Sequence, residues 1–134
     1  MLNPLPSLLS LGFFAPTILR IVLGLLFVVF GINKLTKQKT EKSKFFEKIG
    51  LRPGKIFTAV FGAIELAAGV LLIIGLYTQI AAITAAVISF GAFYTKSRQI
   101  ELLPESKSYY FILFAISVSL ALTGAGALAF DLPL

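Results

Sequence analysis

The stretch from Lys55 to Gly75 constrains the fold more than any other part of this sequence. Between Ile56 and Ile74 it is apolar apart from one charge, Glu65, near its middle. As a helix rising about 1.5 Å per residue, this run is roughly 28 Å long, close to the thickness of a bilayer's hydrocarbon core. A carboxylate at that depth is costly unless it is protonated, paired or hydrated. The stretch therefore predicts a membrane span in which Glu65 needs a partner.

Composition extends this prediction to the whole chain. Of its 134 residues, 57% are hydrophobic and 13% are charged, whereas soluble domains carry about 25% charge. We therefore expect a multi-pass membrane protein with a single domain over residues 1–134. The chain contains no Cys and no His, which removes disulfides, thiolate metal sites and the commonest haem and zinc ligand. We expect no metal site and no cofactor held by protein ligands.

The apolar runs predict an all-α fold, a transmembrane four-helix bundle with antiparallel up-down topology. The expected spans are residues 17–35, 55–75, 79–95 and 108–130. Only residues 76–78 separate the second span from the third, and a connection that short requires an antiparallel hairpin. Phe45 and Phe46 lie among lysines in the first connection. This pattern is typical of a short amphipathic helix on the membrane surface between spans 1 and 2.

Glycines and charges share one face on each of the first two spans, in steps of four and three residues. The face on the first span consists of Arg20, Gly24, Phe27, Gly31 and Lys34. The face on the second consists of Thr58, Gly62, Glu65 and Gly69. Residues spaced in this way lie on one side of a helix, and glycines there let two helices approach closely. We expect the four glycines to form the contact between spans 1 and 2.

Glu65 admits four interpretations: an ion pair with Arg20 or Lys34, a protonated hydrogen-bond donor, part of a proton or substrate path, or a contact to a quinone headgroup or partner. Depth favours Arg20 as the partner, because Lys34 lies further from the level of Glu65 along the bundle. Direction favours Lys34, because helical side chains lean towards their own N-terminus. We expect a charged face formed by Arg20, Lys34 and Glu65, with Arg20 as the direct or water-bridged contact. Snorkelling of Arg20 to the interface is the alternative.

Basic residues predict the orientation. Of twelve Lys and Arg residues, eight lie between Lys34 and Lys55 and three between residues 96 and 107. The positive-inside rule places loops 36–54 and 96–107 in the cytoplasm and both termini outside the cell membrane. The basic first loop also suits anionic lipid headgroups. Nothing in its pattern indicates nucleic-acid binding. Residues 1–15, broken by Pro4 and Pro6, are either an interfacial segment or a frayed terminus.

Several motifs resemble the DoxX family of small four-span membrane proteins. They are the run from Arg20 to Leu35, the pair Phe45-Phe46 followed by Ile49-Gly50-Leu51-Arg52-Pro53, and the run from Gly62 to Leu76. The resemblance covers roughly residues 17–95. The family takes its name from similarity to a subunit of archaeal terminal-oxidase and thiosulfate:quinone oxidoreductase assemblies.

The resemblance implies a small subunit or accessory of a membrane oxidoreductase, with quinone as its cofactor and a redox subunit as its partner. It identifies no catalytic residue. The alternative is a small-molecule or proton carrier, or a membrane assembly factor, without a redox role. The sequence leaves open whether the chain forms a homo-oligomer.

Overall fold

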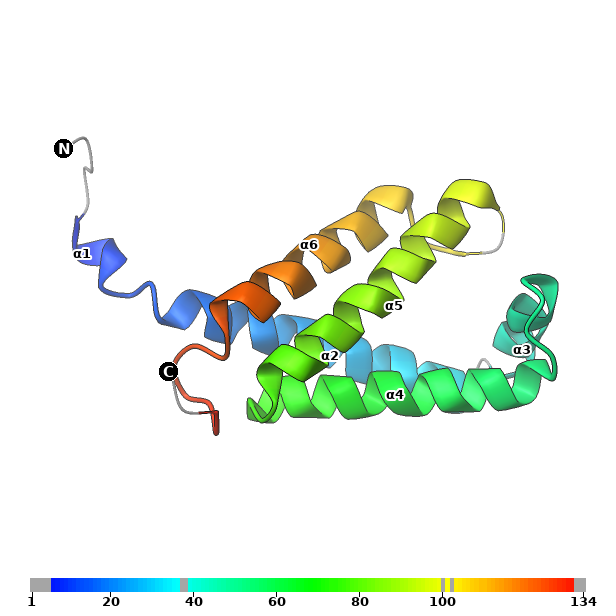
Figure 1. Ribbon diagram of the computed structural model, residues 1–134, viewed down its shortest axis with the longest axis horizontal. Coiled ribbons are helices and arrows are strands. Elements are labelled where there is room, and N and C mark those ends of the chain that lie inside the picture. Colours follow the sequence, from blue (N-terminus) through cyan, green and yellow to red (C-terminus); the bar gives the residue numbers. More distant parts are fainter. Residues whose placement is uncertain (1–5, 37–38, 100, 102, 132–134) are drawn as a thin grey trace.

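A computed structural model describes residues 6–36, 39–99, 101 and 103–131, and these form helices and connections without any strand (Figure 1). Parts of the segments discussed above lie outside the described residues, namely 1–5, Lys37, Gln38, Ile100, Leu102 and 132–134. The helices are α1 (Pro6–Leu9), α2 (Phe14–Leu35), α3 (Lys39–Lys48), α4 (Gly54–Ile74), α5 (Thr78–Arg98) and α6 (Lys107–Thr123). The expected all-α fold is confirmed.

Two helix hairpins make up the bundle. One consists of α2 and α4, which pack closely along their length, and the other of α5 and α6. Figure 1 shows the second hairpin crossing the first and diverging from it towards α3. We call that end of the molecule the α3 end, and the opposite end, where α4 turns into α5, the Gly75 end. The hairpins therefore meet closely at the Gly75 end and separate at the α3 end.

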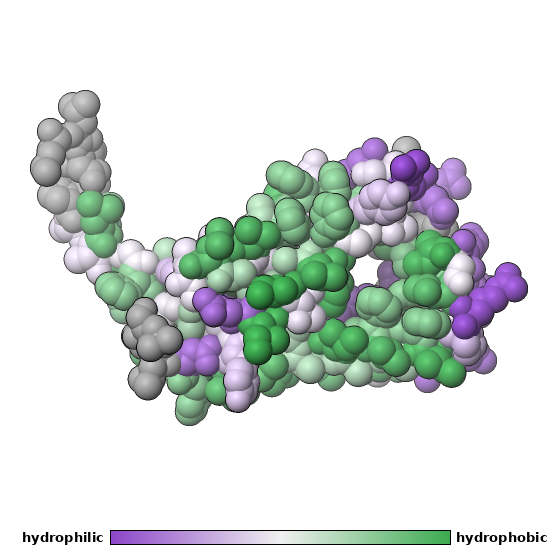
Figure 2. Space-filling view, in the orientation of Figure 1, coloured by the Kyte–Doolittle hydropathy of each residue, from purple (hydrophilic) through white to green (hydrophobic). Residues whose placement is uncertain are grey.

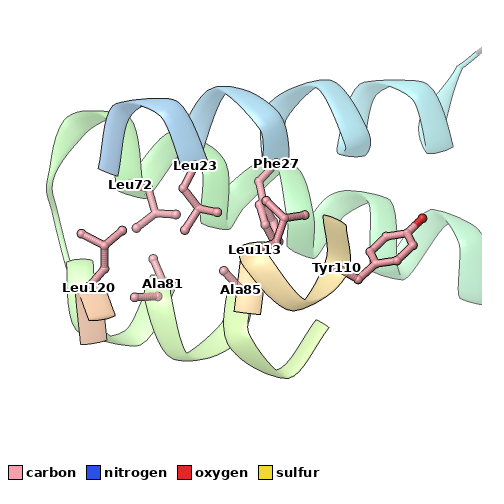
Figure 3. Packing of buried hydrophobic residues seen from close by; sticks show 9 residues of the cluster. Leu23, Phe27, Leu72, Ala81, Ala85, Tyr110, Leu113 and Leu120 are labelled. Carbon is pink, nitrogen blue, oxygen red and sulfur yellow. The ribbon is translucent and has the colours of Figure 1, made fainter. Parts of the chain in front are cut away.

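The hydrophobic core lies between the hairpins, towards the Gly75 end. Figure 3 shows side chains from all four long helices converging there. The buried residues of this cluster are Leu23, Phe27, Leu72, Ala81, Ala82, Ala85, Tyr110, Leu113 and Leu120. Three alanines on α5 are small enough to bring its backbone near the first hairpin, so the two hairpins are held together mainly at this end.

Glycines lie at the contact between α2 and α4. A Cβ atom placed on Gly24 would lie 2.8 Å from the carbonyl oxygen of Gly69, and one on Gly69 would lie 2.7 Å from that of Gly24. A Cβ on Gly31 would lie 2.7 Å from the carbonyl oxygen of Gly62. Real side chains do not tolerate such distances. The absence of side chains at these positions therefore sets the distance between the two backbones.

The fourth apolar helix ends earlier than expected. We expected it to run to about Phe130, but α6 ends at Thr123. Gly124 and Gly126 adopt positive φ angles of 78° and 69°, which glycine tolerates and which end the helix. The chain then folds back over the Gly75 end, where the amide of Ala127 donates to the carbonyl of Phe13 at 3.1 Å.

The same C-terminal segment also provides hydrogen-bond acceptors for the first backbone amides of α5. The turn before α5 places Gly75 and Tyr77 in the left-handed region, with φ of 76° and 50°. The carboxylate of Asp131 accepts hydrogen bonds from the amides of Tyr77 at 2.9 Å and Thr78 at 2.6 Å. Helix N-termini carry amides without intrahelical partners, and carboxylates satisfy them well. Asp131 therefore serves as the cap of α5 from more than fifty residues away in the sequence.

The apolar surface of the molecule matches a bilayer. By length and composition, α2, α4 and α5 are each able to cross a membrane, whereas α6 is a shorter apolar helix of 17 residues. Large apolar side chains on the outer face of α2 are exposed, among them Ile18, Val22, Leu25 and Val29. Figure 2 shows hydrophobic residues over most of the visible face and hydrophilic ones towards both ends of the bundle. The chain is a multi-pass membrane protein.

We predict that Gly69→Leu destabilises the bundle. The new side chain would collide with the backbone of α2, and such overpacking costs about 1–3 kcal/mol. The measurement is the melting temperature in mild detergent. The matched control is Gly91→Leu, because a Cβ on this helical glycine meets nothing within 4 Å. Equal melting temperatures for the two variants would contradict the role of the glycine contact.

Candidate functional site

A cavity of about 440 Å³ lies between the two hairpins at the α3 end. It forms where the hairpins diverge, and α3 and residues 103–105 border it at that end. Figure 2 shows it as an opening between the hairpins, next to α3. Aromatic side chains supply much of its wall: Phe27, Phe30, Phe45, Phe46, Phe61 and Tyr110. The volume is in the range of binding sites for small molecules, about 300–1,000 Å³.

Local packing of α3 shapes the aromatic wall. Ser43 and Phe46 are buried against the start of α4. The ring of Phe46 stacks on Phe61 at a centroid distance of 5.2 Å and meets Phe45 edge-on at 5.3 Å. Offset and edge-to-face pairs of this kind stabilise aromatic clusters. The amphipathic helix that we expected in the first connection thus packs on the protein as well as forming one side of the cavity.

A buried ion pair lies in the cavity wall. The ammonium of Lys34 donates a hydrogen bond to Oε1 of Glu65. The side chain of Glu65 is 2% exposed and that of Lys34 is 18% exposed. A carboxylate buried among apolar helices is stabilised by a partner of opposite charge, so Lys34 accounts for the position of Glu65.

The expected direct or water-bridged contact between Arg20 and Glu65 is wrong, because Glu65 pairs with Lys34 and Arg20 lies at the other end of the bundle. Both Lys34 and Glu65 lean towards the N-termini of their own helices, and because α2 and α4 are antiparallel, the two side chains converge. The level of the backbones favours the same pair, because Lys34 packs against Gly62, three residues from Glu65, whereas Arg20 lies beside Gly75, ten residues from it. The expected depth was therefore wrong, and level and side-chain direction both favour Lys34.

Arg20 lies at the opposite end of the bundle. Its side chain is buried, with an exposed fraction of 1%, and its Nη2 donates to the carbonyl of Leu128 at 2.8 Å. Nearby, the hydroxyl of Thr17 donates to the carbonyl of Ala127 at 2.5 Å. The expected charged face is thus divided: Lys34 and Glu65 share the cavity, and Arg20 holds the C-terminal segment.

Sequence reasoning missed Lys42 as a cavity residue. It lines the cavity from α3, four residues before the buried Phe46. Burial lowers the pKa of Lys42, the charge of Lys34 lowers it further, and the charge of Glu65 opposes both effects. The four-residue spacing from Phe46 was a usable signal, because it places Lys42 on the inner face of α3.

Two further polar groups of the cavity wall retain hydrogen-bonding capacity. Within the described part of the chain, Oε2 of Glu65 and Oγ of Ser89 are buried and have no hydrogen-bond partner. Buried polar atoms are nearly always paired, so such atoms beside a cavity are suited to a ligand. Asn33, Tyr110 and Glu105 also line the cavity.

Aromatic, charged and polar side chains line the cavity together. No group of three His, Cys, Asp or Glu side chains able to hold a metal ion occurs among the described residues. The cavity instead combines flat apolar walls with a cation, a carboxylate and hydroxyl groups. It suits a small amphipathic molecule with a ring and polar substituents. Fold and site together define a multi-pass membrane protein with an amphipathic cavity between two hairpins.

The chain belongs to the DoxX family, whose model matches residues 15–98. It is also similar to the putative oxidoreductase CatD of Bacillus subtilis (strain 168). The two are 36% identical over 115 residues, which cover 85% of this chain and 82% of that protein. No solved structure matches the chain. The matched family region contains the glycine contact between α2 and α4, the ion pair and α3.

We predict that Lys34→Met destabilises the fold more than Glu65→Gln. Removing Lys34 leaves the buried carboxylate without a partner, and breaking a buried pair in this way costs about 3–5 kcal/mol. Glu65→Gln removes the negative charge but keeps a side-chain oxygen that accepts a hydrogen bond from Lys34. The ammonium of Lys34 is also partly exposed, so it loses less when its partner becomes neutral. Melting temperatures in detergent test the order.

The double variant Lys34→Met/Glu65→Gln should melt at a higher temperature than Lys34→Met alone, because it removes both charges and leaves no unpaired carboxylate. Lys55→Met is the matched control, since Lys55 is exposed. A larger loss for Glu65→Gln than for Lys34→Met would show that the ion pair is not the dominant interaction of Glu65.

Proposed function

We propose that this protein is the membrane subunit of a quinone-linked oxidoreductase, and that its cavity binds the quinone ring. The observation that carries the proposal is the buried Lys34–Glu65 pair in the wall of an aromatic cavity. The family resemblance to quinone oxidoreductase subunits supports it, as does the name of the similar Bacillus subtilis protein. The quinone would be a substrate that exchanges with the membrane.

The lining of the cavity suits the two kinds of surface on a quinone. The ring faces are apolar and flat, and the phenylalanine side chains of α2, α3 and α4 offer stacking partners. The two carbonyl oxygens accept hydrogen bonds. The ammonium of Lys34 and the hydroxyl of Ser89 are donors in the cavity wall. Hydrogen bonds from charged donors are stronger than neutral ones, so Lys34 would fix the orientation of the ring.

Electrons would come from a partner subunit in this proposal. Reduction of a quinone to a quinol consumes two electrons and two protons, and the ring carries that chemistry. The sequence contains neither Cys nor His, so it lacks the usual ligands of haem and iron–sulfur centres. A redox-active partner would supply the electrons, and water at the α3 end would supply the protons. The chain's own contribution is to bind and orient the ring.

The orientation that we propose places the α3 end in the cytoplasm. All four long helices would cross the membrane, with both termini outside. Lys44, Lys48 and Lys55 are exposed at the α3 end, where they would meet the anionic headgroups of the cytoplasmic leaflet. The quinone cavity would then lie within reach of a soluble cytoplasmic redox partner.

We predict that the purified protein in lipid nanodiscs binds 2,3-dimethyl-1,4-naphthoquinone, a ring without a long tail, and that Ser89→Ala and Lys34→Met weaken this binding. Loss of a hydrogen bond from a charged donor costs about 1.5–3 kcal/mol, so Lys34→Met should weaken binding at least tenfold. Ser89→Ala should weaken it several-fold. Isothermal titration calorimetry provides the measurement.

Ser89→Ala also separates binding from folding, because it removes a hydroxyl that has no partner in the described structure. Lys55→Met controls for the loss of one positive charge outside the cavity lining. Unchanged affinity in both cavity variants would contradict the proposed site. Ring binding without any co-purifying redox subunit would favour the alternative of a carrier.

The orientation predicts which introduced cysteines an impermeant thiol reagent reaches in intact cells. The chain has no native cysteine, so each variant carries one reactive site. Thr40 on α3 and Leu128 in the C-terminal segment are both exposed. Thr40→Cys should not react with the reagent until the cells are opened, because it would face the cytoplasm. Leu128→Cys should react in intact cells. The reverse pattern would invert the proposed topology.

A further inference from the structure

The cavity reaches the surface of the molecule beside α5, where Val87 and Gly91 line it and are also exposed. Val87, Gly91 and Thr95 line the cavity from α5, and Phe61 lines it from α4. Figure 2 shows the opening beside these helices, bordered mainly by hydrophobic residues.

In the proposed orientation, the opening lies at a depth where lipid surrounds the protein. Phe61 is seven residues from the start of α4 at Gly54, and Gly91 is seven residues from the end of α5 at Arg98. Each is thus about 10 Å from the end of its helix, measured along the axis. Both helices are long and apolar enough to span a membrane. The side opening therefore faces acyl chains rather than water.

Gly91 differs from the glycines that bring α2 and α4 together. A Cβ on Gly91 would meet nothing within 4 Å, whereas those on Gly24, Gly31 and Gly69 would collide with backbone. In a helix interior, glycine is less favourable than alanine by about 1 kcal/mol. Close packing against a neighbouring helix therefore does not explain why position 91 is a glycine. The missing side chain leaves open space at the point where α5 borders the cavity.

We propose that Gly91 marks the path by which the apolar tail of a membrane quinone leaves the cavity. The ring lies beside Lys34 and Glu65, and the tail passes Gly91 of α5 into the bilayer. This inference rests on the proposed quinone site and specifies its substrate class as a quinone with a long alkyl or isoprenoid tail, loaded sideways from the membrane. The polar groups of the cavity and its apolar side opening match the two ends of such a molecule.

The test compares two ligands with the same ring. One is 2,3-dimethyl-1,4-naphthoquinone, and in the other a decyl chain replaces one methyl group. Gly91→Phe would place a bulky side chain in the open space at the rim. It should weaken binding of the decyl compound at least tenfold and that of the dimethyl compound less than threefold. The ratio of the two effects is independent of how the decyl compound partitions into lipid.

One control variant accompanies the test. Val22→Phe adds an aromatic ring to the outer face of α2, where Val22 is half exposed, and should change neither affinity by more than twofold. The melting temperature of Gly91→Phe should match that of the wild type, since the added side chain enters open space.

The outcomes separate the two proposals. Equal weakening of both ligands by Gly91→Phe, or no weakening of either, would overturn the tail path while leaving the ring site intact. Binding of the dimethyl compound with rejection of the decyl compound by the wild type would do the same. Failure of the wild type to bind either compound would overturn the quinone site itself, and the tail path with it.

Discussion

The carboxylate of Glu65 is the constraint on which the rest of this structure depends. A charge buried among apolar helices is stable only beside an opposite charge, and Lys34 meets that requirement from the neighbouring helix. The contact is reached because glycines let α2 and α4 approach until their backbones nearly touch. The first hairpin is therefore a closely packed unit, and its charged side-chain pair faces the space between the hairpins. The second hairpin packs on it at the Gly75 end and leaves the pair facing a cavity.

This division of the bundle separates stability from binding. The core residues that hold the hairpins together gather towards the Gly75 end, where small side chains on α5 permit close packing. At the α3 end the hairpins diverge, and aromatic side chains line the space between them without filling it. A ligand that occupies this space would add contacts between hairpins that otherwise touch little there. Binding should therefore restrain the relative motion of the two hairpins.

The sequence alone was enough to predict the helical membrane fold, its hairpin connections and the short helix before α4. Those features follow from local patterns: apolar run length, short connections and amphipathic spacing. The sequence could not reveal the partner of Arg20 or the end of α6. The backbone of residues 124–131 folds over the Gly75 end and accepts hydrogen bonds from Arg20 and Thr17. The choice of Lys34 over Arg20 depended on the register of α2 against α4, which places Lys34 beside Gly62 and Arg20 beside Gly75. The cavity depended on an angle between hairpins that no local pattern encodes.

The link between Arg20 and Leu128 joins residues 108 positions apart, and this separation has a consequence for biogenesis. When α2 enters the membrane, the carbonyl that receives its guanidinium has not yet been synthesised. Arg20 must remain at the lipid–water interface, or in contact with the insertion machinery, until α6 and the segment after it have been inserted. The cap that Asp131 supplies to α5 is subject to the same delay. The Gly75 end should thus be the last part of the protein to mature, and truncation before Leu128 should leave an inserted chain exposed to membrane quality-control proteases.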